Sequence, residues 1–218
     1  MNGISVVFDL DGTLLDSATD IVAALDIAVV EAGVKLNLPI SPQIVGPPIR
    51  GMLARLGVPM TESQVATAVQ AFRRAYDDSL MELTQPYPGA AECLRSLVSM
   101  NCGLYIATIK PLSPTQRLVD RWFSGLFRDI CCVNSEANTA LTKPRMLQKL
   151  SRSHGLSPTR SVMVGDGPSD IRAGRERSWR TVAVLYGYGT REELIPEQPD
   201  AWAESTAEIP ESIQAFVW

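Results

Sequence analysis

The feature that most constrains this chain is a short apolar run followed at once by two aspartates and a glycine. The run from Ile4 to Phe8 is rich in β-branched and aromatic side chains, which predict a buried strand. Gly12 then favours a turn. Asp9 and Asp11 should therefore emerge together at the carboxyl end of the strand, which is the end where open α/β sheets bind their ligands.

Two carboxylates in one turn repel each other unless a cation lies between them or one of them keeps a proton. An aspartate beside a divalent ion can attack phosphorus and form an aspartyl-phosphate. The neighbouring aspartate can protonate the leaving group and later accept a proton from water. The alternative is a purely structural acidic turn, in which Asp11 and Gly12 close a loop that Thr13 caps. The short pattern alone leaves both interpretations open.

Length and composition limit the classes of protein to which the chain can belong. Its 218 residues can form one large domain or a core with a smaller domain, and 45% hydrophobic residues suffice for a packed core. A net charge of -4 with scattered basic residues does not indicate a nucleic-acid ligand. We find no apolar run that could span a bilayer, no signal-peptide pattern and no metal-type cysteine spacing. We therefore expect a cytoplasmic protein without a membrane partner; the oligomeric state cannot be predicted from the sequence.

The periodicity of apolar residues divides the chain into two parts. Residues 15–85 show three- and four-residue spacing without a strand signal, which predicts a helical cap domain inserted after the first strand. Residues 1–14 and 86–218 return to strands separated by helices, which predicts an α/β core domain with a doubly wound parallel sheet. The strands expected after the insert are 104–108, 130–133, 161–164 and 181–185.

Polar residues follow several of these predicted strands and should meet at one edge of the sheet. Thr108 ends the second strand, Lys143 opens the helix after the third, and Asp166 and Asp170 follow the fourth. A lysine can neutralise phosphoryl oxygens, and a threonine hydroxyl can donate to them. Asp166 could complete an oxygen-ligand site for magnesium. Each residue alone could instead be a helix cap, a surface charge or part of a turn, but their convergence favours a shared site.

Four segments resemble, in this order, the motifs of the haloacid dehalogenase-like hydrolase superfamily: Asp9-x-Asp11-Gly12-Thr13, Thr108, Lys143-Pro144 and Gly165-Asp166-x-x-x-Asp170. The similarity extends over essentially the whole chain. The helical insert is similar to the cap of the phosphoglycolate phosphatase and β-phosphoglucomutase branch. The resemblance therefore implies a Rossmann-like core with a helical cap domain.

The same resemblance implies a role for each matching residue. The dehalogenase members lack an acid at the position of Asp11, so this residue favours phosphorus chemistry over halide chemistry. The implied roles are Asp9 as nucleophile and metal ligand, Asp11 as general acid and base with its backbone carbonyl on the metal, Thr108 and Lys143 as phosphoryl ligands, Asp166 as a magnesium ligand, and Asp170 as the residue that orients Lys143 or a metal-bound water.

Two further residues bear on the substrate. Many relatives of this branch carry Asn after the second-motif threonine, whereas Ile109 stands here. Its side chain cannot donate to a substrate oxygen, although its backbone amide can still bind the phosphoryl group, so the substrate of near relatives does not transfer directly. In the insert, Arg50 could clamp a second anion in bidentate fashion, or it could be a surface charge on a helix.

The sequence therefore predicts a magnesium-dependent phosphatase that forms an aspartyl-phosphate and acts on a small phosphorylated metabolite. Phosphoglycolate, pyrophosphate, a nucleotide and a sugar phosphate all stay open as substrates. One alternative is a phosphotransferase such as a sugar-phosphate mutase. Another is a signalling or binding protein that accepts phosphate on aspartate without turnover.

Overall fold

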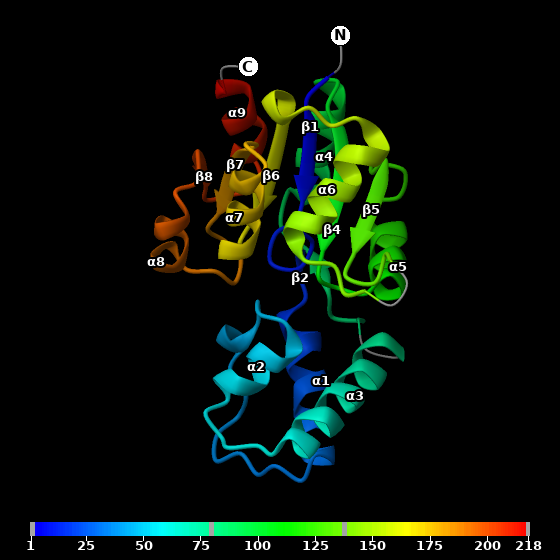
Figure 1. Ribbon diagram of the computed structural model, residues 1–218, viewed down its shortest axis with the longest axis vertical. Helices are drawn as coiled ribbons and strands as arrows, with labels where there is room; N and C mark the ends of the chain where they lie inside the picture. Colours follow the sequence, from blue (N-terminus) through cyan, green and yellow to red (C-terminus); the bar gives the residue numbers. More distant parts are fainter. Residues whose placement is uncertain (1–2, 79–80, 137–138, 217–218) are drawn as a thin grey trace. The chain divides into compact units, whose positions relative to one another are not determined.

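The computed structural model describes residues 3–78, 81–136 and 139–216, and it divides into two compact units (Figure 1). The first unit takes the chain up to Leu15 and again from Pro86 onward, and the second takes Asp16–Gln85. The first unit is an α/β domain and the second is helical. The predicted fold class, a doubly wound parallel sheet with a helical domain inserted after the first strand, is confirmed.

A six-stranded parallel sheet forms the centre of the α/β unit, in the order β5-β4-β1-β6-β7-β8. Because both faces are covered, most positions of β4 and β6 are buried, as in other parallel sheets. The strand β8 was not predicted from the sequence, because it has only three residues and no β-branched side chain. The strands are β1 (Ser5–Phe8), β4 (Gly103–Thr108), β5 (Asp129–Cys132), β6 (Ser161–Gly165), β7 (Arg180–Val184) and β8 (Ala201–Ala203).

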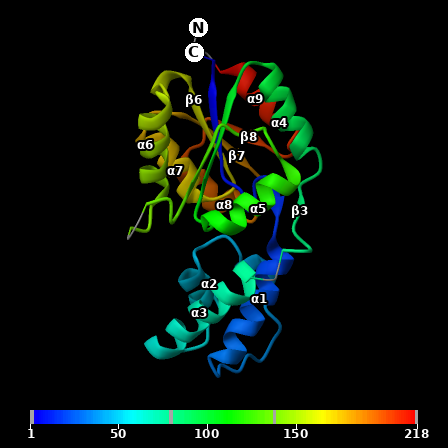
Figure 2. The same ribbon diagram turned by 90° about the vertical axis from the view of Figure 1, so that its right-hand side faces the viewer.

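Helices cover the two faces of this sheet (Figure 2). On one face lie α4 (Ala90–Ser99) and α9 (Glu208–Ala215), and on the other lie α6 (Lys143–His154) and α7 (Pro168–Glu176). Tyr105 and Ala107 of β4 share a buried cluster with Leu147 of α6, because alternate residues of a strand point to the same face. The remaining helices of the unit are α5 (Leu112–Trp122) and the short α8 (Arg191–Leu194).

The strand order places a topological switch point between β1 and β6. From β1 the chain moves outward to β4 and β5, then crosses back to β6 and continues outward to β7 and β8. Phe8 is level with Val164, and the backbone N–H of Asp9 donates to the carbonyl of Val164 at 2.9 Å. The carboxyl ends of β1 and β6 therefore open onto the kind of crevice in which α/β sheets bind ligands.

The helical unit consists of α1 (Ala18–Glu31), α2 (Ile49–Arg55) and α3 (Glu62–Asp78). A capping box opens α3: the Thr61 hydroxyl accepts from the N–H of Gln64 at 3.2 Å, and the Gln64 side chain accepts from the N–H of Thr61 at 2.9 Å. The Thr84 hydroxyl donates to the buried Asp20 carboxylate at 2.6 Å and so ties the end of the unit to its first helix. Where the chain passes between units, β2 (Leu15–Asp16) and β3 (Gln85–Pro86) form a two-stranded sheet.

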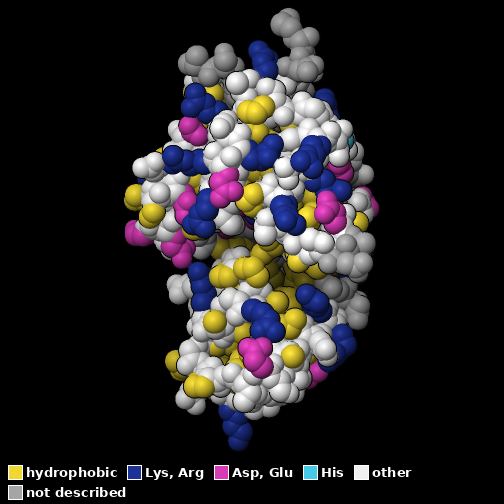
Figure 3. All heavy atoms as spheres, viewed as in Figure 1, with side chains coloured by type: hydrophobic (Ala, Val, Ile, Leu, Met, Phe, Trp, Pro, Cys, Tyr) yellow, Lys and Arg dark blue, Asp and Glu magenta, His cyan; other side chains and the backbone are white. Residues whose placement is uncertain are grey.

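Basic and acidic side chains are interspersed on the face of the molecule seen in Figure 3. This mixture agrees with the small net charge of -4. Among the described residues, none of the helices combines the length and the apolar composition needed to cross a bilayer.

Candidate active site

A buried lysine joins two aspartates at the carboxyl edge of the sheet. Lys143 is the first residue of α6, and its Nζ lies 2.8 Å from Asp9 Oδ1 and 2.6 Å from Asp170 Oδ1. Asp9 follows β1, and Asp170 lies in the first turn of α7, where its carboxylate also accepts from the N–H of Gly167 at 3.1 Å. Three segments far apart in the sequence therefore meet in one charged cluster, as the sequence analysis predicted for these residues.

Asp166, directly after β6, is fixed by two hydrogen bonds from other loops. Its Oδ1 accepts from the Thr13 hydroxyl at 2.9 Å, and its Oδ2 accepts from the N–H of Tyr188 at 2.9 Å. Gly12 and Gly187 allow this close packing. A Cβ on Gly12 would lie 2.2 Å from Asp166 Oδ2, and one on Gly187 would lie 2.4 Å from the Asp166 Cβ. The loop that follows β7 has no role among the sequence predictions, although its Tyr188 amide fixes Asp166.

Oxygen atoms of Asp9, Asp166 and Asp170 all lie within 4.8 Å of one another. Hard divalent cations such as magnesium prefer carboxylate oxygens, so the chemistry of this donor set fits such an ion. The cluster contains Asp170 in addition to the two side chains that the sequence analysis assigned to the metal. The side chains that would hold magnesium here are therefore Asp9 and Asp166, with Asp170 close by.

The Asp11 side chain has a different partner from Asp9. Both of its carboxylate oxygens lie 2.9 Å from Nζ of Lys110, a side chain that is only 3% exposed. The turn thus aims the two aspartates at two different lysines. Lys110 is absent from the residues that the sequence predicts for this site. The signal that could have found it is its place two residues after Thr108, at the end of a strand next to β1.

The remaining predicted residues lie in different surroundings. Thr108 is buried, and its hydroxyl oxygen accepts from the N–H of Lys110 at 3.3 Å. Ile109 packs against the hydrophobic cluster beneath α6, which explains why an apolar side chain is accommodated at this position. Arg50 belongs to the helical unit, where its Nη1 lies 3.2 Å from Glu62 and its side chain is 60% exposed.

The match to known proteins identifies the family of the chain. A protein-family model described as haloacid dehalogenase-like hydrolase matches residues 6–184. The chain belongs to this family. It is 31% identical to a phosphoglycolate phosphatase of Pseudomonas putida, over 89% of this chain and 74% of that protein. It is 27% identical to an N-acetylmuramic acid 6-phosphate phosphatase of Pseudomonas aeruginosa, over 84% and 82% of the two chains.

A solved structure shares the fold over nearly the whole length of this hydrolase. It is a haloacid dehalogenase-like hydrolase from Streptococcus pneumoniae, with a TM-score of 0.85 and 27% identity. The similarity covers 95% of this chain and 97% of that one. Both the α/β core and the inserted helical domain are therefore part of the family fold.

The electrostatics of the hydrolase site favour a cation. Burial raises the pKa of Asp9 to about 6 despite the nearby charge of Lys143. Burial together with the charge of Asp9 raises the pKa of Asp166 to about 6, and burial also raises the pKa of Asp170. Burial opposes a charge on Lys143 as well, but Asp170 and Asp9 more than offset this and raise its pKa. One ammonium does not neutralise three carboxylates, so a divalent ion would stabilise the ionised site.

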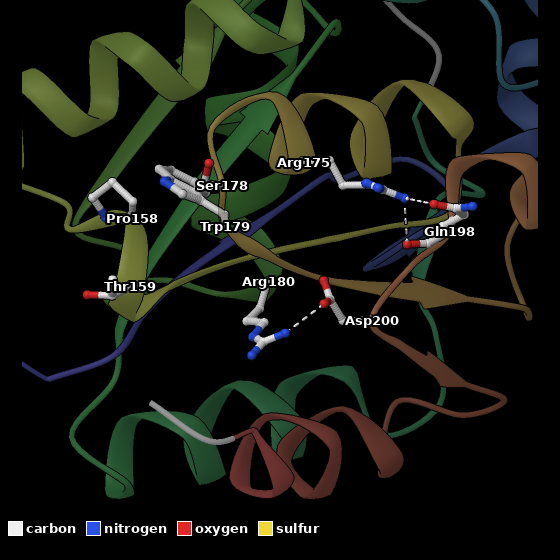
Figure 4. Close-up of a pocket in the computed structure, with 8 residues that line it drawn as sticks. All are labelled: Pro158, Thr159, Arg175, Ser178, Trp179, Arg180, Gln198 and Asp200. Carbon is white, nitrogen blue, oxygen red and sulfur yellow. Dashed lines mark hydrogen bonds and ion pairs between the residues drawn. The ribbon is translucent and has the colours of Figure 1, made fainter.

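A pocket of about 520 Å³ lies elsewhere in the α/β unit, near the amino ends of β6, β7 and β8 (Figure 4). Its two arginines are engaged by neighbours: Arg175 donates to the Gln198 side chain at 2.8 Å, and Arg180 pairs with Asp200 at 2.9 Å. The residues that line it do not include the aspartate cluster. We therefore place the candidate active site at the carboxyl edge and not in this pocket.

Replacing Gly187 by alanine should weaken magnesium binding by roughly tenfold or more, as loss of the groups that support metal ligands commonly does. The added Cβ would lie 2.2 Å from the carbonyl oxygen of Gly12 and would displace Asp166. The measurement is the thermal stabilisation of the protein over a magnesium titration. Gly103→Ala is the control, because the nearest atoms to its Cβ would belong to the flexible end of the Arg128 side chain, at 3.0 Å. Equal magnesium affinity in both variants would contradict this account of the glycine.

The apparent affinity for magnesium should rise with pH up to about 6 and then level off. The pKa values of Asp9 and Asp166 are raised to about 6, so below that pH the ion must displace protons from its ligands. Calorimetric titration with magnesium between pH 5 and 8 measures this, and two buffers of different ionisation enthalpy report the protons released. An affinity that stays constant down to pH 5 would contradict the assignment of these carboxylates as ligands.

Proposed function

We propose that this chain is a magnesium-dependent phosphatase, which hydrolyses the phosphoric monoester of a small metabolite through an aspartyl-phosphate on Asp9. The observation that carries the proposal is the environment of the Asp9 carboxylate. It lies 2.8 Å from a buried ammonium and in one cluster with Asp166 and Asp170. A carboxylate in such a place can act as a nucleophile towards a phosphoryl group that the positive charge of Lys143 attracts.

In the first step, a carboxylate oxygen of Asp9 attacks phosphorus. A bond forms between Asp9 and the phosphoryl group as the bond from phosphorus to the ester oxygen breaks. Asp11 donates a proton to the departing oxygen, which leaves as an alcohol. Lys110 can hold Asp11 in place for this role, because its Nζ lies 2.9 Å from the Asp11 carboxylate.

In the second step, water attacks the phosphorus of the aspartyl-phosphate. Asp11, now ionised, accepts the proton of this water, so that inorganic phosphate forms and Asp9 is released as a carboxylate. The proton that Asp11 gave to the leaving group is thereby recovered. In the transition state of each step, negative charge accumulates around the phosphoryl group. The other groups of the site have to stabilise this charge.

Groups around Asp9 supply this compensation. Lys143 holds its ammonium beside the attacking carboxylate and offsets the phosphoryl charge. Thr108 accepts a hydrogen bond from the backbone of Lys110 and can donate its own proton to a phosphoryl oxygen, as can the amide of Ile109. Magnesium held by Asp9 and Asp166 would neutralise a further part of the charge on the phosphoryl oxygens.

The substrate class of this proposal is a small phosphomonoester. One of the related proteins is named a phosphoglycolate phosphatase, and another is named an N-acetylmuramic acid 6-phosphate phosphatase. Membership in a hydrolase family favours water as the final acceptor over a second sugar phosphate, and it favours turnover over stoichiometric signalling. In the helical unit, Arg50 is our candidate for recognising a second anion on the substrate, because its contact with exposed Glu62 is of a kind that contributes little energy.

Asp9→Asn should lower magnesium-dependent phosphate release by at least roughly 10³-fold, the scale on which loss of a nucleophile acts. The amide cannot replace the carboxylate as an attacking group. Phosphate release is measured over a panel of esters that includes phosphoglycolate, a nucleoside monophosphate, a sugar phosphate and p-nitrophenyl phosphate. Asp129→Asn is the matched control, since this aspartate pairs with His154 and its side chain is 43% exposed. Retained turnover in Asp9→Asn would remove Asp9 from this role.

Arg50→Ala should raise KM roughly tenfold for esters that carry a second anionic group, the effect expected for loss of a charge-assisted hydrogen bond. KM for p-nitrophenyl phosphate, which lacks such a group, should stay unchanged. Arg74→Ala is the control, because this arginine of the same unit is similarly exposed and pairs with Glu31. An unchanged KM over the whole panel would discard Arg50 as a substrate ligand.

A further inference from the structure

Two of the four lysines of this chain are buried, and both lie at the carboxyl edge of the sheet. Lys35 is exposed and Lys149 is half-buried, whereas Lys110 and Lys143 are 5% and 4% exposed. Withdrawing an ammonium from water costs free energy unless the group is paired. Lys143 has a place in the proposed chemistry through Asp9. Lys110 pairs with Asp11, so the reason for its burial is to be sought at that carboxylate.

The contact between Lys110 and Asp11 is well suited to hold a proton donor in place. Lys110 Nζ lies 2.9 Å from each of the two carboxylate oxygens. If one oxygen of Asp11 carries the proton to be donated, the other can still accept from the ammonium. The ammonium therefore fixes the orientation of the carboxyl group, because one anchored oxygen sets the direction of the other one.

The backbone at Lys110 connects this anchor to the phosphoryl ligands. Its N–H donates to the Thr108 hydroxyl oxygen at 3.3 Å, and Phe8 of β1 is level with Ile106 of β4. The segments that follow Phe8 and Ile106 therefore start from neighbouring positions. Three consecutive residues from Thr108 to Lys110 would thus set the distance between the bound phosphoryl group and the carboxyl group that protonates the leaving oxygen.

We propose that Lys110 is a positioning residue that holds the Asp11 carboxyl group for proton transfer to the leaving group. This inference rests on the proposed phosphatase function. Lys110 itself transfers no proton and touches no substrate atom. Its loss should matter most where the leaving group depends on protonation, and little where the leaving group departs readily as an anion.

The test compares phenyl phosphate with p-nitrophenyl phosphate, which have similar shapes but a poor and a good leaving group. The quantity is kcat/KM with magnesium present, because it covers the steps up to departure of the leaving group and omits the later attack by water. In Lys110→Met, kcat/KM for phenyl phosphate should fall at least roughly tenfold more than for p-nitrophenyl phosphate, within the range that general acid catalysis contributes. Lys110→Gln provides the same comparison if the Met variant does not fold.

Two controls separate positioning from general damage to the structure. Lys149→Met removes a half-exposed lysine 3.7 Å from Glu136 and should leave the ratio between the two esters unchanged. Combined with Asp11→Asn, the Lys110→Met change should have little further effect on phenyl phosphate, because coupled residues are not additive. An equal loss on both esters, no loss, or full additivity with Asp11→Asn would overturn the inference while leaving the phosphatase proposal intact. A wild-type protein inactive on both esters and on the whole panel would overturn the proposed function and this inference with it.

Discussion

Three carboxylates and the ammonium of Lys143 lie together at the carboxyl edge of the sheet, where they are largely buried from water. The excess of negative charge in this cluster determines what else the site must bind. Burial raises the pKa of Asp9 and of Asp166 to about 6, so the ionised form is costly without further positive charge. A divalent cation and an incoming phosphoryl group fit such a site together, because the cation neutralises both sets of oxygens. The same need explains why Lys143 is buried here.

The fold gathers these groups by means of strand order. Because β1 and β6 are neighbours, Asp9 and Asp166 lie beside each other although more than 150 residues separate them in the sequence. The helices that follow the strands bring Lys143 and Asp170 to the same place from their first turns. Glycines then allow the loops to close on Asp166, since a Cβ on Gly12 would lie 2.2 Å from its Oδ2.

Much of this arrangement could be predicted from the sequence, because strands that alternate with helices imply a parallel sheet whose carboxyl ends meet. Asp9, Lys143, Asp166 and Asp170 were predicted on that basis, and they form one cluster. Lys110 was missed because a buried lysine differs from a surface lysine only in its surroundings, which depend on packing between distant segments. For the same reason the sequence could not indicate that the Tyr188 amide holds Asp166. The strand β8 was missed because three residues carry too little pattern.

The most direct test of this account is a crystal structure with manganese as an anomalous stand-in for magnesium. We expect one strong anomalous peak at the carboxyl edge of the sheet, with carboxylate oxygens of both Asp9 and Asp166 at about 2.1 Å, the distance typical of such ions. Lys143 should still contact Asp9 in that structure. The claim that these carboxylates are assembled around a cation would be contradicted by an anomalous peak at another place. It would also be contradicted by an aspartate cluster that stays free of metal at saturating manganese.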